Sequence, residues 1–323
     1  MVYKLVSPGD IQPVDLGVEL LFTKYLPKNT LLVLDSIHNS SALQIPDYIK
    51  HTVFEWSSNP VDIEQRWPEV ALESCTVLTG LFKYFKNPLP YHNTKFFPFW
   101  ALWTSYQYAN QYCNHAKTHS VSCLNGTTWD HRKFVYLNLA NKNYFDQMIF
   151  SYGHRPIQDH NQYSNNGVNL QLTGEELQDL SQLPQRITYY DDGPVDIFEL
   201  THPAYTSAYV NLVTETTIRA DTPMLSEKTF KPIAAGQLFV LVASPGSIQF
   251  LRDIGIDTFD DIIDHSYDNV IDARARLLAA LTQVDYLMTL NLEQIFPSIQ
   301  TRLQRNATFF TSDEFRKQFP LSI

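Results

Sequence analysis

The chain has 323 residues, and this length predicts two domains because one hydrophobic core rarely organises so many residues. Hydrophobic residues make up 44% and charged residues 18%, which is typical of folded globular proteins and excludes a disordered chain. The 24 basic and 34 acidic side chains give a formal net charge of −10, which disfavours a protein whose whole surface grips nucleic acid.

The first part of the chain contains short apolar runs separated by polar and proline-bearing connections. The runs at 30–34, 52–56 and 75–78 predict strands. An aromatic cluster at 96–103 follows and leads into a predicted helix through Tyr106 and Tyr108. We predict that this part, residues 1–115, forms a first domain.

From residue 120 onward, strand-like and helix-like segments alternate. Strands are predicted at 121–124, 147–151, 186–190, 209–214 and 238–243, and helices at 130–139, 173–180, 227–235 and 270–290. A further helix is predicted at 292–303, with a kink or interruption at Pro297. Alternating strands and helices predict parallel sheets covered by helices on both faces, so the fold class is α/β. We predict that residues 116–323 form the second domain.

The sequence shows neither a membrane span nor a secretory signal, and its cysteine pattern favours a reducing compartment, so we predict a cytoplasmic protein. The longest strong apolar run, 238–243, is far shorter than the ~18 residues of a membrane span. The first residues, Met1 to Pro8, lack the apolar stretch of a secretory signal. Cys75, Cys113 and Cys123 are odd in number and show no Cys-x-x-Cys spacing, which favours a reducing compartment over disulfides or zinc.

The most informative stretch runs from Ser226 to Gln237. Ser226 is a good N-cap, and Gly236 stands where the helix should end, just before an apolar strand. A helix N-terminus suits an anion such as a phosphate, and Lys228 adds a full positive charge. Glu227 offers a carboxylate to vicinal sugar hydroxyls. These residues predict half of a nucleotide-diphosphate-sugar site, and the competing interpretation is an ordinary solvated helix end.

Further candidate residues stand at the ends of predicted strands. Asn125 and Gly126 end the strand at 121–124 and would let the backbone approach a ligand. Arg132 opens the next helix, and its competing interpretation is a surface charge. Glu215 ends the strand at 209–214, where open α/β sheets place ligand-binding residues. A buried structural carboxylate is the alternative for Glu215.

The segment from about Asn211 to Asp268 resembles the donor-binding half of GT-B glycosyltransferases, especially fucosyltransferase-like enzymes and related phage or bacterial sugar transferases. The matching stretches are Val213–Glu215, Leu225–Pro232, Ala235–Phe239, Gly255–Phe259 and Asp264–Asp268, with a looser echo at His131–Arg132. The resemblance implies two Rossmann-like domains whose parallel sheets face a central cleft. It also implies an acceptor domain at 1–115, a donor domain at 116–323, and terminal helices that pack back on the first domain.

The resemblance assigns roles to these residues in an inverting transfer of a sugar from a UDP- or GDP-linked donor to a hydroxyl. Lys228 and Arg132 would hold the diphosphate, the arginine because its position matches one that reaches the phosphates in fucosyltransferase-like enzymes. Glu215 and Glu227 would position the ribose or the sugar. Tyr267 would contact the nucleotide or merely close the domain. The catalytic base of such enzymes generally comes from the first domain.

Asp35, at the end of the strand 30–34, is the first candidate for that base, and His38 is the second. A plain strand-capping aspartate is an equal alternative for Asp35. Two acidic pairs, Asp191-Asp192 and Asp260-Asp261, are the candidates for a metal site in the sequence. Neither pair follows a segment that resembles a nucleotide-binding strand, so neither is predicted to hold a metal ion. We therefore expect no metal and no obligatory cofactor, since Lys228, Arg132 and the helix dipole replace the charge of Mg²⁺.

Two alternatives to a glycan or small-molecule transferase stay open. One is a phage enzyme, working in the host cytoplasm, that glycosylates hydroxymethylated DNA bases. A modest basic stripe for DNA would come from Lys83, Lys86, Lys95, Lys117 and Arg132, although the net charge of −10 opposes a duplex footprint. The other is a non-catalytic module that binds nucleotide sugars, because a fold does not guarantee chemistry.

Overall fold

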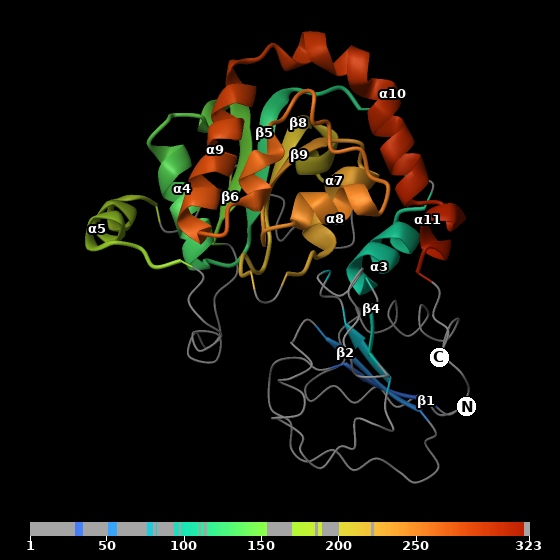
Figure 1. Ribbon diagram of the computed structural model, residues 1–323. Coiled ribbons are helices and arrows are strands. Elements are labelled where there is room, and N and C mark those ends of the chain that lie inside the picture. Colours follow the sequence, from blue (N-terminus) through green and yellow to red (C-terminus); the bar gives the residue numbers. More distant parts are fainter. Residues whose placement is uncertain are drawn as a thin grey trace. The chain divides into compact units, whose positions relative to one another are not determined.

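The computed structural model (Figure 1) describes residues 30–34, 51–56, 76–79, 82, 94–96, 98–109, 111–112, 115–153, 170–184, 187–188, 200–220 and 223–319. The chain divides into two compact units. One contains Met1–Trp103 and Arg316–Ile323, and the other contains Thr104–Phe315. The domain boundary at residue 115 stays a prediction.

The first unit contains a parallel sheet. Its described strands are β1 (Thr30–Leu34), β2 (His51–Trp56), β3 (Thr76–Thr79) and β4 (Thr94–Phe96), in the order β1-β2-β3-β4. Every neighbouring pair is parallel. The three predicted strands of this part are confirmed to within one residue, and β4 is an addition at the start of the aromatic cluster.

The second unit holds a larger sheet (Figure 1), whose described strands are ordered β7-β6-β5-β8-β9. They are β5 (His119–Asn125), β6 (Met148–Tyr152), β7 (Ile187–Thr188), β8 (Ala208–Thr214) and β9 (Leu238–Val242). All pairs are parallel except β6 with β7. Every residue of β6 and of β9 is buried, as expected for parallel strands covered on both faces. The predicted α/β class with parallel sheets is confirmed.

The helices connect and cover these strands. They are α3 (Phe99–Gln107), α4 (Asp130–Ala140), α5 (Gly174–Gln182), α6 (Pro203–Thr206), α7 (Glu227–Ala234), α8 (Ser247–Asp253), α9 (Ala273–Thr289), α10 (Leu292–Phe310) and α11 (Asp313–Lys317), with 3₁₀ turns at Phe145–Gln147 and His265–Asn269. Helix α9 packs on β9 and α4, and α10 packs on α7. Of the kink or interruption predicted at Pro297, the interruption does not occur, since α10 continues through this residue, and the kink stays a prediction. No helix of the described residues has the length and apolar character to cross a membrane.

The strand order creates one special edge in the second unit. The chain runs from β5 to β6 on one side, and then returns to β8 on the other side of β5. The connection that follows β5 leads through α4 to β6, and the connection that follows β8 leads through α7 to β9 in the opposite direction. The two connections separate at the carboxyl ends of β5 and β8, and open α/β sheets bind ligands in that crevice. The residues that follow β5 and β8 are therefore the place to look for a site.

Candidate functional site

Helix α7 begins and ends as its sequence predicts. The hydroxyl of Ser226 accepts a hydrogen bond from the backbone N–H of Lys228 at 3.3 Å, which is the action of an N-cap. At the other end, Gly236 has a φ of +64° and donates its N–H to Ile233 O at 3.1 Å. The N–H of Gln237 reaches Pro232 O at 2.9 Å. This pair of bonds satisfies the last carbonyls of the helix.

Glu227 and Lys228 form an ion pair at the start of α7. The Lys228 ammonium donates to Glu227 Oε1 at 2.7 Å and to Ser226 Oγ at 3.3 Å. Burial opposes ionisation of Glu227, yet the nearby Lys228 and Lys231 ammonium groups hold its pKa below the ordinary value. The lysine side chain is 34% exposed and the glutamate 9% exposed. Lys228 is therefore the member of the pair that solvent or a ligand reaches most easily.

Glu215 follows β8 directly and is 0% exposed. Its Oε1 accepts from the Ser226 N–H at 2.9 Å and from Thr229 Oγ1 at 2.6 Å. Its Oε2 accepts from Ser226 Oγ at 2.6 Å and from the Thr216 N–H at 3.2 Å. A carboxylate has about four lone-pair sites, and four donors of the chain itself occupy them. This geometry is that of the buried structural carboxylate, the alternative that the sequence left open.

The same carboxylate changes the expectation for the helix N-terminus. The sequence predicts free N–H groups at the start of α7 that would receive a phosphate. In the structure the Ser226 N–H binds Glu215, the Lys228 N–H binds Ser226 Oγ, and the Thr229 N–H binds Ser226 O at 3.1 Å. The expected set of free N–H groups is therefore corrected, since these three already have partners.

The first turn of α4 carries two buried side chains that form hydrogen bonds with backbone carbonyls at the end of β8. Arg132 is 3% exposed, and its NH2 group donates to Thr214 O at 2.9 Å and Glu215 O at 3.3 Å. His131 is 2% exposed, with its Nε2 at 2.9 Å from Glu215 O. Because a carbonyl only accepts, this nitrogen carries the proton. Burial, together with repulsion by Arg132, lowers the pKa of His131 to about 3.

These contacts exclude the interpretation of Arg132 as a surface charge. Its guanidinium also donates to Thr127 O at 3.3 Å, so three carbonyls around the ends of β5 and β8 surround it. The group organises the backbone of the crevice. A direct contact between Arg132 and a diphosphate stays a prediction.

Asn125 joins the ends of the two central strands. It is 0% exposed, and its Oδ1 accepts from Thr214 Oγ1 at 2.5 Å while its Nδ2 points to Cys123 Sγ at 3.2 Å. Gly126 follows it and is partly exposed. A close approach of a ligand to this backbone stays a prediction.

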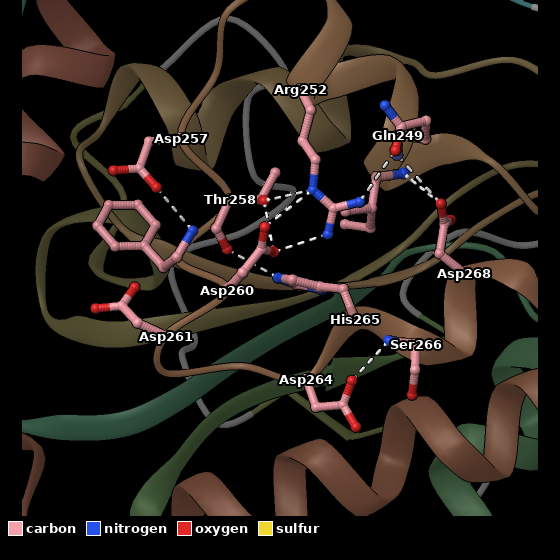
Figure 2. Close-up of polar contacts among 12 residues, drawn as sticks. Gln249, Arg252, Asp257, Thr258, Asp260, Asp261, Asp264, His265, Ser266 and Asp268 are labelled. Atoms are coloured by element: carbon pink, nitrogen blue, oxygen red, sulfur yellow. Dashed lines mark hydrogen bonds and ion pairs between the residues drawn. The ribbon is translucent and has the colours of Figure 1, made fainter.

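Tyr267 lies in the segment that also contains the Asp260-Asp261 pair, and Figure 2 shows the polar contacts of residues from this segment. The Tyr267 hydroxyl accepts from the Leu241 N–H of β9 at 3.1 Å and lies 3.0 Å from His265 Nδ1. Asp268 Oδ2 accepts from the N–H groups of Ile248 and Gln249, which caps α8. Tyr267 is 2% exposed and closes the side of β9. A nucleotide contact of Tyr267 stays a prediction, and the contacts seen are structural.

The two adjacent aspartates each pair with an arginine. Asp260 binds Arg252 of α8, with Oδ1 2.8 Å from NH2 (Figure 2). Asp261 binds Arg302 of α10, with Oδ2 2.8 Å from NH1. No group of three or more His, Cys, Asp or Glu side chains in the described part of the chain is placed to hold a metal ion. Independence of a metal stays a prediction.

The candidate bases Asp35 and His38 lie outside the described residues, and their role stays a prediction.

Sequence reasoning also missed three contributors to the crevice. Thr229 has a local signal, because it stands three residues after the N-cap, where a side chain turns back to the helix start. Thr216 has none. Arg276 of α9 is buried and donates to the carbonyls of Ala243, Val270, Ile271 and Ile218. Only the fold brings it to Ala243 and Ile218, which are 33 and 58 residues away in the chain.

No family model and no curated protein matches the chain. A structure of T4 phage BGT with UDP and Mn²⁺ matches with 12% identity and a TM-score of 0.43, over 90% of this chain and 81% of that chain. A structure of the DNA-modifying enzyme β-glucosyltransferase, with and without uridine diphosphoglucose, matches with 11% identity and a TM-score of 0.43, over 90% and 80%. A point mutant of T4 phage BGT with UDP-glucose matches with 12% identity and a TM-score of 0.41, over 90% and 83%.

These likenesses are too weak to carry an argument about activity. The similar structures are β-glucosyltransferases, and membership of the fucosyltransferase-like group stays a prediction.

Proposed function

We propose that the protein is a glycosyltransferase that binds a nucleotide-diphosphate sugar at the carboxyl ends of β5 and β8. The observation that carries this proposal is the Glu227–Lys228 pair, whose ammonium and carboxylate are 2.7 Å apart at the start of the helix that follows β8. An ammonium suits a diphosphate, and a carboxylate accepts hydrogen bonds from the vicinal hydroxyls of ribose or a sugar. The strand order supports the location, because ligands of open α/β sheets bind at this edge.

Lys228 has a specific chemical task in this proposal. The acceptor hydroxyl attacks the anomeric carbon, the bond from that carbon to the phosphate oxygen breaks, and the hydroxyl proton passes to a base. Negative charge grows on the departing diphosphate, and a fixed cation beside it stabilises the transition state more than the ground state. Arg132 adds its buried charge from behind the crevice. We assign the base to Asp35 or His38 and the outcome to inversion.

The donor is UDP- or GDP-linked, and the acceptor that we favour is a glycan or another small hydroxyl compound. The transfer would need no metal if Lys228 and Arg132 supply the positive charge. A test of this point is the rate of nucleoside diphosphate release with EDTA and with added Mn²⁺ or Mg²⁺. Equal rates support independence of a metal, and a rate that depends on added ion contradicts it.

Calorimetric titration with UDP and GDP tests the site. We expect Lys228→Ala to weaken binding about tenfold or more, since a charge-assisted hydrogen bond is lost. Lys142→Ala is the matched control, because Lys142 has a similar exposure and also pairs with a carboxylate, that of Asp285. Unchanged affinity of Lys228→Ala refutes the site, and a wild type that binds neither nucleotide refutes the function.

The release of nucleoside diphosphate without an acceptor distinguishes an active transferase from a non-catalytic binding module. Glycosyltransferases that lack an acceptor can pass the sugar to water, so we expect slow release of UDP or GDP from a donor panel. Release that stops in Lys228→Ala supports catalysis at this site. Tight nucleotide binding with no release, with or without candidate acceptors, would support the non-catalytic module instead.

A further inference from the structure

We propose that Glu215 is a positioning residue, which holds Lys228 in place through the Ser226 hydroxyl and binds no ligand itself. This inference rests on the proposed function, because it assigns a task in the same crevice. It differs from the expectation that Glu215 contacts the ribose or the sugar. Three observations carry it: the filled carboxylate, the direction of the Ser226 hydroxyl, and the anchoring of the Glu215 backbone.

The direction of the Ser226 hydroxyl follows from its neighbours. Glu215 Oε2 lies 2.6 Å from Ser226 Oγ, and a carboxylate oxygen only accepts, so the hydroxyl donates to it. The lone pairs of Ser226 Oγ are then turned to Lys228, whose N–H and whose ammonium both lie at 3.3 Å. Hydrogen bonds therefore run from the Lys228 ammonium to Ser226, and from Ser226 to Glu215.

The carboxylate also fixes the first turn of α7 from a second side. Thr229 Oγ1 donates to Glu215 Oε1 at 2.6 Å, beside the Ser226 N–H at 2.9 Å. The three residues thus place the helix start relative to β8. Since Glu227 and Lys228 lie between Ser226 and Thr229, their positions are set by this contact.

The backbone of Glu215 is held as firmly as its side chain. Its N–H donates to Val242 O of β9 at 2.9 Å. Its carbonyl accepts from His131 Nε2 at 2.9 Å and from Arg132 at 3.3 Å. Buried groups with complete hydrogen bonding are rigid and costly to disturb, which suits a residue that positions others. The anchoring links α4, β8, β9 and α7 at one point.

A double-mutant cycle on nucleotide affinity separates positioning from direct contact. The variants are Glu215→Gln, Lys228→Ala and their combination, titrated with whichever of UDP and GDP the wild type binds. We expect Glu215→Gln to weaken binding about tenfold in the wild type and less than about twofold in Lys228→Ala, because the effect passes through the lysine. Additive losses indicate a direct ligand contact and overturn the proposal.

Asp268→Asn controls for simple loss of stability. Asp268 is also a buried carboxylate that accepts backbone N–H groups at a helix start, that of α8. We expect it to lower the thermal midpoint as Glu215→Gln does, while nucleotide affinity changes less than about twofold. An equal loss of affinity in both variants would mean a general structural effect and would overturn the proposal.

A second readout needs no ligand and so distinguishes failure of this inference from failure of the proposed function. It is the NMR signal of the Lys228 side-chain ammonium, assigned by its absence in Lys228→Ala. We expect Glu215→Gln and Ser226→Ala to shift this signal from its wild-type position. Ser226→Thr should leave the signal near the wild-type position because the hydroxyl is kept, and Asp268→Asn should leave it unchanged. A signal that is the same in Glu215→Gln and the wild type overturns the positioning role, even if the wild type binds no nucleotide.

Discussion

At the scale of single residues, His131 is a buried group of the crevice that stays uncharged beside charged neighbours. Its imidazole is buried beside the Arg132 guanidinium, and these two causes lower its pKa to about 3, against an ordinary value of 6.5. The folded protein therefore binds fewer protons here than the unfolded chain between these pH values. The contribution of His131 to stability is present above the unfolded pKa and is lost as the pH falls toward 3.

This pKa predicts a measurable slope. Between pH 7 and pH 5 the wild type should lose about 2 kcal/mol more unfolding free energy than His131→Gln, whose amide N–H keeps the donor to the Glu215 carbonyl. Urea denaturation of both proteins at the two pH values measures the difference, and the other histidines cancel in the comparison. Parallel losses in the two proteins would contradict a neutral, buried His131.

At the scale of elements, α7 depends on the glycine that ends it. Gly236 has a φ of +64°, and a Cβ at this position would lie 2.4 Å from Tyr112 Cε2. We expect Gly236→Ala to lower the unfolding free energy by about 1–3 kcal/mol, from the left-handed conformation and the displaced ring. Gly174→Ala is the control, because nothing lies within 4 Å of its Cβ position in α5. It should be neutral or slightly stabilising, and equal effects of the two changes would contradict this account.

At the scale of the whole molecule, charge bears on the acceptor. The net charge is −10. In the structure, some residues of the basic stripe that a DNA acceptor would need are not available as surface cations. Arg132 is buried, and burial lowers the pKa of Lys117 to about 8, where the ammonium also donates to Tyr205 O at 3.2 Å. The other three lysines of the stripe have no described side chains. Two of its five members are therefore not free surface cations.

We accordingly expect duplex DNA with hydroxymethylcytosine to bind more weakly than about 10⁻⁴ M at physiological salt, the weak end of ordinary non-specific binding. An electrophoretic shift assay over a salt series measures this affinity. Incubation of the same DNA with a sugar-nucleotide panel, followed by nucleoside mass spectrometry, is the decisive companion experiment. A sugar-bearing nucleoside would reverse our preference for a glycan or small-molecule acceptor.

Local chemistry made part of this protein predictable from its sequence. The positions of the described strands other than β4, the Ser226 cap and the Gly236 stop follow from hydrophobic periodicity and from backbone rules that act within a few residues. Alternating strands and helices were enough to predict parallel sheets, because a parallel pair needs a crossover. Of the two effects predicted for Pro297, an interruption does not occur, since α10 continues through that residue, and a kink stays a prediction.

Tertiary structure alone decided what each charged residue at the crevice does. The sequence placed Arg132, Glu215 and Lys228 at one edge of a sheet and suggested a ligand for each. Arg132 instead binds carbonyls 82 and 83 residues away, and His131 binds one 84 residues away. Glu215 turns inward to cap α7, and Lys228 stays 34% exposed. Burial and hydrogen-bond partners depend on segments distant in the chain, which is why a pattern of residue types predicts the place of a site but not the direction in which its charges point.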